Sequence, residues 1–145
     1  MIKAVLDTNV LALGILGFVN PQSIPGQGLR LWREGAYQLI VSEWILDELE
    51  RTLTKPFFTH RLSTADAAAG VKALRERALS VAITRNVEGI ASHPEDDRVL
   101  ATALSADADY LVTGDRALQV LGRHAGIQIA SARDFVEVIA AQWEP

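Results

Sequence analysis

Short, continuous runs of apolar residues, separated by helical patterns, constrain the fold of this 145-residue chain more than any other feature. The clearest runs are residues 2–6, 37–41, 110–112 and 127–129, and residues 81–83 form a weaker one. Continuous runs of this kind are typical of strands that helices cover on both faces. Because strands and helices alternate, we expect a single α/β domain over residues 1–145. It would be a three-layer α/β/α sandwich around a mostly parallel sheet of four to five strands.

The segments between these runs have the apolar spacing and the end signals of helices. The predicted helices cover residues 10–18, 29–33 and 65–79, the segment between Ser42 and Pro56, and segments that begin at Pro94, Arg116 and Ser131. Residues 20–26 contain two prolines and a glycine and form the clearest loop signal in the chain.

The composition excludes several kinds of site. The chain has no cysteine, which excludes disulfides, thiolate zinc sites and cysteine nucleophiles together. Its histidines, His60, His93 and His124, stand at no interpretable spacing from a nucleophile. The apolar N-terminal stretch is interrupted by Asp7 and Asn9, unlike a signal peptide. No run approaches the ~20 apolar residues of a membrane span, so we expect a cytoplasmic protein with no membrane partner.

The net charge of −4 argues against a protein that binds nucleic acid through a basic surface. That objection weakens if carboxylates gather around divalent cations, because each cation locally reverses the sign of the charge. Eleven of the 14 basic residues are arginine, which suits bidentate contacts to phosphate. Ordinary surface charge explains most of these arginines equally well.

Acidic residues follow two of the predicted strands near the point where each strand ends. Asp7 follows the first strand, and Asp115 comes just beyond a later one. Parallel sheets place ligand sites at the carboxyl ends of strands, near the point where the strand order reverses. Glu48 and Asp97, each on a predicted helix, are further candidates for the same edge. Carboxylates without histidine or cysteine suit Mg²⁺ or Mn²⁺.

Each of these carboxylates also has a simpler explanation. Asp7 is a good N-cap for the helix that follows it. Asp97, like the two acids before it, suits the positive end of its helix, and Asp115 suits a turn. Helical phase alone does not choose Glu48 over the other acids of its helix. Taken singly, the residues leave these alternatives open.

Four stretches, taken in order and spacing, give the chain a resemblance to a known family. They are MIKAVLDTNVLALGIL, VSEWILDELERTL, HPEDDRVLATALSADADYLVTGD and SARDFVEVI. Together they resemble the PIN-domain family, and more narrowly its VapC-like branch, the toxins of toxin–antitoxin pairs. The resemblance covers essentially the whole chain, and LDTNV and the DD…ADYLVTGD block are its most specific parts. It implies a metal-dependent ribonuclease that hydrolyses RNA phosphodiester bonds, with one or two Mg²⁺ or Mn²⁺ ions as cofactor.

The resemblance also selects among the acidic residues. The acidic positions of the family fall on Asp7, on Glu48 in the ILDEL segment, on Asp97 four residues before Ala101, and on Asp115. It therefore implies that these four carboxylates are the catalytic and metal-binding residues. The one departure is Arg98, which stands where relatives often carry asparagine.

Side chains near these motifs are predicted to support the four carboxylates. Asn9, Thr113 and Asp96 are expected to orient water or the ligating carboxylates, and capping is an equally good role for Asn9. The basic residues expected to meet RNA phosphates are Arg98, Arg116, Arg51 and Lys55. Arg51 alternatively pairs with Asp47, four residues earlier on the same helix.

Two other functions compete with the ribonuclease. A Mg²⁺-dependent phosphotransfer or phosphatase domain would use Asp7, but DTNVL lacks the second acid of the phosphatase motif and no lysine follows Lys72. A catalytically inactive PIN-like module that binds RNA is the other. The toxin resemblance implies RNA as substrate, a protein antitoxin as partner and a homodimer as a candidate assembly.

Overall fold

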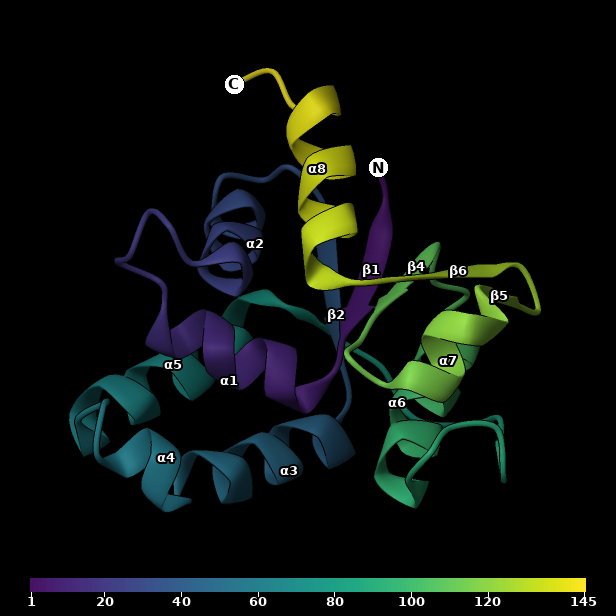
Figure 1. The fold of residues 1–145 in the computed structure, drawn as a ribbon, viewed down its shortest axis with the longest axis horizontal. Coiled ribbons are helices and arrows are strands. Elements are labelled where there is room, and N and C mark those ends of the chain that lie inside the picture. Colours follow the sequence, from purple (N-terminus) through teal and green to yellow (C-terminus); the bar gives the residue numbers. More distant parts are fainter.

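The computed structural model describes residues 1–145, which form an α/β fold (Figure 1). In chain order the elements are β1 (Lys3–Leu6), α1 (Thr8–Leu16), α2 (Ile24–Arg33), β2 (Gln38–Val41), α3 (Glu43–Leu53), α4 (Pro56–Thr59), α5 (Thr64–Arg77), β3 (Leu79–Ser80), α6 (Pro94–Ser105), β4 (Tyr110–Val112), α7 (Arg116–Leu121), β5 (Arg123–His124), β6 (Ile127–Ala130) and α8 (Ala132–Gln142).

The strands form one six-stranded sheet in the order β3-β2-β1-β4-β6-β5. All neighbouring strands are parallel except β5, which pairs antiparallel with β6. In the central register, Val5 of β1 lies between Ile40 of β2 and Leu111 of β4. The mostly parallel sheet confirms the predicted fold class. It has more strands than the four to five expected, because β3 and β5, with two residues each, are too short to give a clear apolar run.

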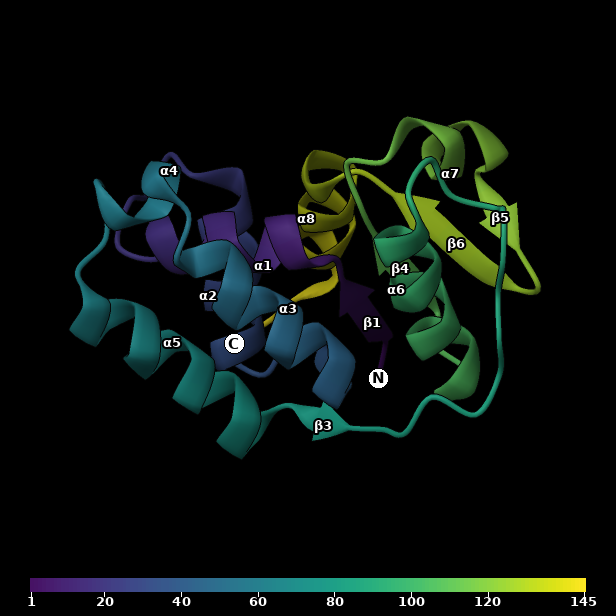
Figure 2. The same ribbon diagram turned by 90° about the horizontal axis from the view of Figure 1, so that it is seen from below.

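Helices cover both faces of the sheet. Figure 2 shows α6 on one side of the sheet and α1, α2 and α8 on the other. The hydrophobic core is one continuous cluster of 30 buried residues. Val5, Leu39 and Leu111, from the three central strands, have no exposed surface. Burial on both faces explains why these strands carry continuous apolar runs.

The predicted loop over residues 20–26 is partly wrong, because α2 begins at Ile24 rather than at residue 29. Ser23 caps the helix by accepting the N–H of Gly26 at 3.0 Å, and Pro25 lies in the first turn, where it is well tolerated. Gly26 serves close packing: a Cβ there would lie 2.1 Å from the carbonyl oxygen of Gly17. The proline–glycine pair therefore marks a helix start packed against the end of α1.

The two outermost strands differ most from the sequence prediction. β3 is Leu79–Ser80 rather than residues 81–83, because its partner β2 ends at Val41, whose carbonyl accepts one last bond from the Val81 N–H at 2.9 Å. β5 was not predicted. It joins β6 through Ala125 and Gly126, which lie at φ +49° and +85°, as in a two-residue hairpin turn. Alanine seldom takes a positive φ, so the sequence carries no clear signal for this turn.

The remaining helices agree with the prediction within a few residues. α3 ends at Leu53, before Pro56, and Pro56 also begins the short helix α4, which was not predicted. α5 starts after its N-cap Ser63 and spans 14 residues. None of the helices combines the length and the apolar character that crossing a membrane requires.

β1 lies where the strand order reverses. The chain passes from β1 to β2 and then β3 on one side, and it returns through α6 to β4 on the other side of β1. Sites in open parallel sheets lie at the carboxyl ends of strands at such a reversal. Asp7 directly follows β1, and Thr113 directly follows β4. The fold therefore brings the first and last predicted acidic motifs to one edge.

Candidate functional site

Asp7 ends β1 and caps α1. Its Oδ1 accepts the N–H of Val10 at 2.8 Å, and its Oδ2 accepts the Thr113 hydroxyl at 2.7 Å and the Gly114 N–H at 3.3 Å. The residue is only 5% exposed. Burial raises the pKa of Asp7 and the charge of Asp115 adds to this, while the hydrogen bonds only partly oppose the rise. The carboxylate of Asp7 therefore both caps α1 and lies at the acidic edge of the sheet.

Thr113 and Asp115 connect the end of β4 to Asp7. The Thr113 hydroxyl, which donates to Asp7, accepts the N–H of Asp115 at 3.0 Å. The Asp115 carboxylate caps α7 by accepting the Leu118 N–H at 2.9 Å, and it also accepts the Ser92 N–H at 3.2 Å. Burial opposes ionisation, but these hydrogen bonds and a neighbouring imidazole outweigh it, so the pKa of Asp115 is lowered. The hydroxyl of Thr113 thus joins the segments that carry both acids.

Asp96, in the first turn of α6, completes a group of three interacting carboxylates. Burial, followed by the charges of Asp7 and Asp115, raises the pKa of Asp96 to about 6, although His93 opposes the shift. No arginine or lysine forms an ion pair with any of the three acids. The edge at the strand reversal is therefore an acidic group that no arginine or lysine pairs with, and His93 interacts with two of its acids.

Asp97 has a different environment from its neighbour Asp96. It is 7% exposed. Its carboxylate accepts three consecutive main-chain N–H groups at 2.7–3.1 Å, those of Gly89, Ile90 and Ala91. The sequence prediction placed Asp97 on the metal and Asp96 in a supporting position. Asp97 is thus bonded to the main chain before α6, whereas Asp96 is the acid of this turn that interacts electrostatically with Asp7 and Asp115.

Glu48 lies in the middle of α3, which packs beside α1. Its carboxylate accepts two hydrogen bonds from Arg51, at 2.6 and 3.1 Å, and its side chain is 20% exposed. The alternative that Arg51 pairs with Asp47 is therefore wrong, since the ion pair forms with Glu48 one turn earlier. The arginine therefore pairs with a predicted metal ligand, and its own side chain is 63% exposed.

Two further predicted residues lie outside the acidic group. Asn9 is exposed in the first turn of α1 and its side chain makes no hydrogen bond, so its predicted alternative role as a cap is wrong and Asp7 holds that position. Arg98 lines a cavity of about 350 Å³ beside Asn86 and Glu88. Residues two apart on a helix point to opposite sides, so Arg98 points away from the side on which Asp96 lies.

Arg116 and Lys55 lie at helix starts. Arg116 is the exposed first residue of α7. It directly follows Asp115, so this predicted phosphate contact is adjacent in sequence to one acid of the group. Lys55 is exposed at the N-cap position of α4, in the short connection between α3 and α4.

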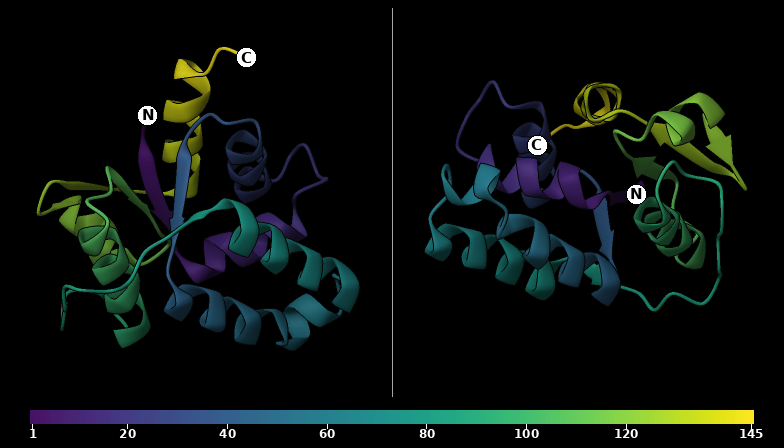
Figure 3. Two further views of the ribbon diagram at one scale, coloured as in Figure 1. Left: turned by 180° about the vertical axis from the view of Figure 1, so that it is seen from behind. Right: turned by 60° about the horizontal axis from the view of Figure 1, so that its bottom comes forward.

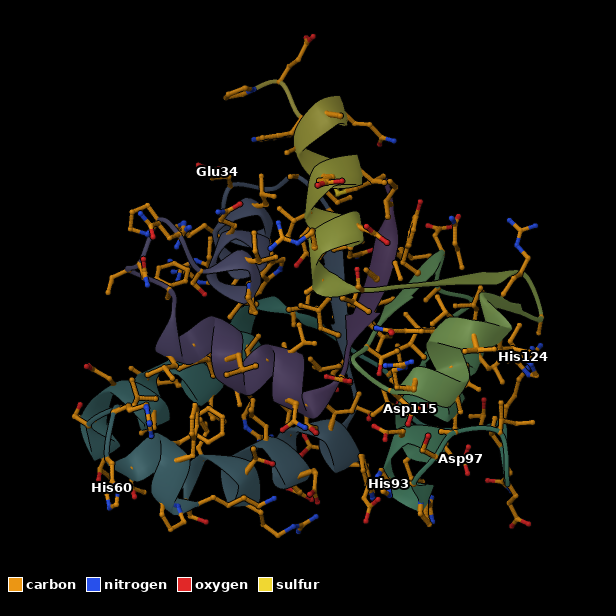
Figure 4. The ribbon with its side chains drawn as sticks, in the orientation of Figure 1. Glu34, His60, His93, Asp97, Asp115 and His124 are labelled. Atoms are coloured by element: carbon orange, nitrogen blue, oxygen red, sulfur yellow. The ribbon has the colours of Figure 1, made fainter.

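His93 is a site residue that the sequence analysis missed. Its charge interacts with Asp96 and with Asp115, and Figure 4 shows it near the labelled Asp115, where α6 begins. His60 and His124 lie elsewhere on the periphery (Figure 4). The sequence feature that could have identified His93 is its position directly before the acidic first turn of α6, in SHPEDD.

The donor set fits a hard divalent cation in its chemistry. Carboxylate oxygens are the ligands that Mg²⁺ and Mn²⁺ prefer, and a cation would relieve the repulsion that raises the pKa of Asp96. In this structure, however, no group of three or more histidine, cysteine or acidic side chains is close enough together to hold a metal ion. Asp115 accepts main-chain N–H groups and Glu48 pairs with Arg51. Binding a cation therefore requires these groups to change partners.

Substituting Asp96 is expected to change how stability depends on pH in the metal-free protein. Its folded-state pKa of about 6 lies above the ordinary 3.8, so its contribution to stability is fully present below about pH 4 and is lost as the pH rises through about 6. In EDTA, the melting temperature of the wild type should therefore fall relative to that of Asp96→Asn between about pH 4 and pH 7. A difference that stays constant over this range, followed by circular dichroism, would contradict the raised pKa.

Comparison with known proteins defines the class to which this fold and acidic edge belong. The family model described as the PIN domain matches residues 3–117. The chain belongs to the PIN-domain family. No curated protein matches the chain.

Among solved structures, the chain is similar to one chain of the crystal structure of VapBC2 from Rickettsia felis bound to a DNA fragment from their promoter. The TM-score is 0.56 at 12% sequence identity, and the likeness covers 88% of this chain and 97% of that chain. At this identity the similarity concerns the fold.

Proposed function

We propose that this protein is a metal-dependent endoribonuclease that hydrolyses RNA phosphodiester bonds. Membership of the PIN-domain family supports nuclease chemistry. The observation that carries the proposal is the group formed by Asp7, Asp96 and Asp115 at the strand reversal, with which no arginine or lysine forms an ion pair. Carboxylates held this close repel one another when they are ionised. A bound divalent cation offsets that repulsion and supports phosphate chemistry.

Asp7, Asp96 and Asp115 would hold one or two Mg²⁺ or Mn²⁺ ions, and Glu48 would join them by releasing Arg51. Asp97 is left out of the ligand set because all three of its hydrogen bonds hold residues 89–91, and Asp96 is the acid of this turn that interacts with Asp7 and Asp115. When bound, the cations supply an acidified water and neutralise charge on the scissile phosphate.

The surrounding residues fix the acids and position the substrate. Thr113 holds Oδ2 of Asp7 through its hydroxyl, and the Val10 N–H holds Oδ1, so the carboxylate cannot rotate. His93 and Arg116, beside Asp115, would contact the phosphates that flank the scissile bond. Released from Glu48, Arg51 would become available for the same role.

The resemblance of the sequence to VapC-like proteins leads us to propose further that this ribonuclease is the toxin of a toxin–antitoxin pair in the cytoplasm. It would be restrained by a protein antitoxin and could form a homodimer. The structural likeness to a chain of VapBC2 supports this reading at the level of the fold. The competing phosphotransfer function is less favoured, because DTNVL lacks the second acid of the phosphatase motif and no lysine follows Lys72.

The proposed function is tested by incubating the purified protein with labelled RNA, including a structured RNA pool, and with DNA of matched sequence. We expect cleavage of RNA in Mg²⁺ or Mn²⁺, none in EDTA, and little cleavage of DNA. Acetyl phosphate should leave no phosphate on the protein. Absence of metal-dependent cleavage would overturn the proposal, and stable phosphorylation of Asp7 would favour the phosphotransfer function instead.

A further inference from the structure

A long irregular connection reaches the acidic site from the far edge of the sheet. Residues 81–93, called here the connecting segment, join β3 to α6 without helix or strand. Figures 2 and 3 show this segment passing around the outer side of α6 before it enters that helix. Structureless connections of this length are uncommon in small domains and often have a function.

Hydrogen bonds to three side chains hold the connecting segment at successive points. Near its start, Ser105 Oγ accepts the N–H groups of Thr84 and Arg85 at 2.9 and 3.1 Å. In the middle, Asp97 accepts the N–H groups of residues 89–91. At the end, Asp115 accepts the Ser92 N–H. The segment is therefore fixed to α6 and α7 by polar contacts.

Asp97 is the strongest of these anchors. Its Oδ2 accepts from Gly89 at 3.0 Å, and its Oδ1 accepts from Ile90 at 3.1 Å and from Ala91 at 2.7 Å. Gly89 takes φ +71°, which lets consecutive N–H groups converge on one anion. Hydrogen bonds to an ionised acceptor are stronger than neutral ones, and this carboxylate is only 7% exposed.

Apolar packing in the middle of the connecting segment is limited to two partly buried side chains, Val87 and Ala91. A cavity of about 350 Å³ lies between residues 86–89 and α6. The side chain of Ile90 is 36% exposed. Without the carboxylate of Asp97, the middle of the connecting segment would therefore have little to hold it against the helix.

The end of the connecting segment belongs to the site. Ser92 bonds to Asp115, and His93, the next residue, interacts with both Asp96 and Asp115. Asp97 follows Asp96 directly in α6. One buried carboxylate thus ties the segment that carries Ser92 and His93 to the helix turn that carries Asp96.

We propose that Asp97 is a positioning residue. It fixes residues 89–91 and thereby sets Ser92 and His93 against Asp115 and Asp96, and it does not ligate the metal itself. The positioning role rests on the proposed ribonuclease function, whereas the anchoring of the segment does not.

The test compares Asp97→Asn with Asp96→Asn and with Ser105→Ala as a matched control. In Asp97→Asn the amide oxygen can still accept from Ile90 and Ala91, but its NH₂ group faces the N–H of Gly89. NMR would follow main-chain amide exchange and the ring signals of His93. Mn²⁺ affinity and the separate values of kcat and KM on RNA would be measured on the same proteins.

For Asp97→Asn we expect amide exchange at residues 89–91 to rise at least ~10-fold and the His93 ring signals to shift. The Mn²⁺ affinity should stay within about threefold, and kcat should fall ~10–100-fold, the usual cost of losing an orienting contact. Asp96→Asn should show the reverse pattern, with weakened Mn²⁺ binding and unchanged exchange. Ser105→Ala should raise exchange only at residues 84–85 and leave cleavage unchanged.

Loss of Mn²⁺ binding in Asp97→Asn with unchanged exchange at residues 89–91 would make Asp97 a metal ligand and overturn the proposal. Unchanged exchange with unchanged His93 signals would overturn it as well. If the wild type neither binds Mn²⁺ nor cleaves RNA, the proposed function fails, and the exchange and His93 measurements still decide whether Asp97 is the anchor. Asp97→Ser, which keeps one acceptor oxygen, replaces Asp97→Asn if that variant does not fold.

Discussion

Asp7→Asn is expected to lower metal-dependent RNA cleavage by at least ~100-fold without unfolding the protein. Losing a residue that merely orients metal ligands already costs ~10–100-fold, and Asp7 would be a ligand itself. Asparagine has the same shape and is an equally good N-cap, so the bond from Val10 to the side chain survives. Burial raises the pKa of Asp7, so removing its charge also removes a cost to folding at neutral pH.

The matched control is Asp109→Asn. Asp109 also ends a connection into the sheet, but it accepts the Lys3 N–H at the opposite end of the strands. Cleavage by this variant should equal that of the wild type. Both variants would be assayed at several Mn²⁺ concentrations, with melting temperatures measured in EDTA. Substantial activity in Asp7→Asn at saturating metal would remove Asp7 from the site, and with it the central element of the proposed function.

The sequence predicts the central part of this fold well because its signals there are local and strong. The runs at residues 2–6, 37–41 and 110–112 correspond to β1, β2 and β4, whose residues are buried on both faces. Strand ends at a parallel sheet then place Asp7 and Asp115 at one edge, where Thr113 bonds to the Asp7 carboxylate and to the N–H of Asp115. The periphery is harder, because β3 and β5 depend on partners and on a turn that no run of residues reveals.

The choice between Asp96 and Asp97 depends on contacts that the sequence does not show. Both acids lie in the first turn of α6, and both suit the positive end of a helix. What distinguishes them is the connecting segment, whose N–H groups at residues 89–91 converge on Asp97. That contact depends on the path of an irregular loop, which apolar periodicity does not encode. The pairing of Glu48 with Arg51 is similarly a side-chain choice that spacing leaves open.

The segment after residue 117 lies outside the family match, yet it supplies part of the core. Phe135 of α8 is 1% exposed. Its ring meets those of Tyr37 and Tyr110 edge-on, with centroids 4.9 and 5.4 Å away. The Tyr37 hydroxyl donates to the Gly28 carbonyl at 2.9 Å, which fixes that ring from the other side. Phe135 therefore joins α8 to the start of β4 and to the connection between α2 and β2.

Phe135→Ala is expected to reduce the free energy of unfolding by about 3–5 kcal/mol, because it removes buried ring surface and leaves a cavity. Urea unfolding followed by circular dichroism measures this loss. Glu137→Ala, an exposed position on the same helix, is the control and should change stability by less than about 0.5 kcal/mol. A loss below about 1 kcal/mol for Phe135→Ala would mean that α8 contributes little to the core. The site lies at the carboxyl end of β4, whereas Tyr110 is its first residue, so cleavage by the folded variant should stay close to that of the wild type.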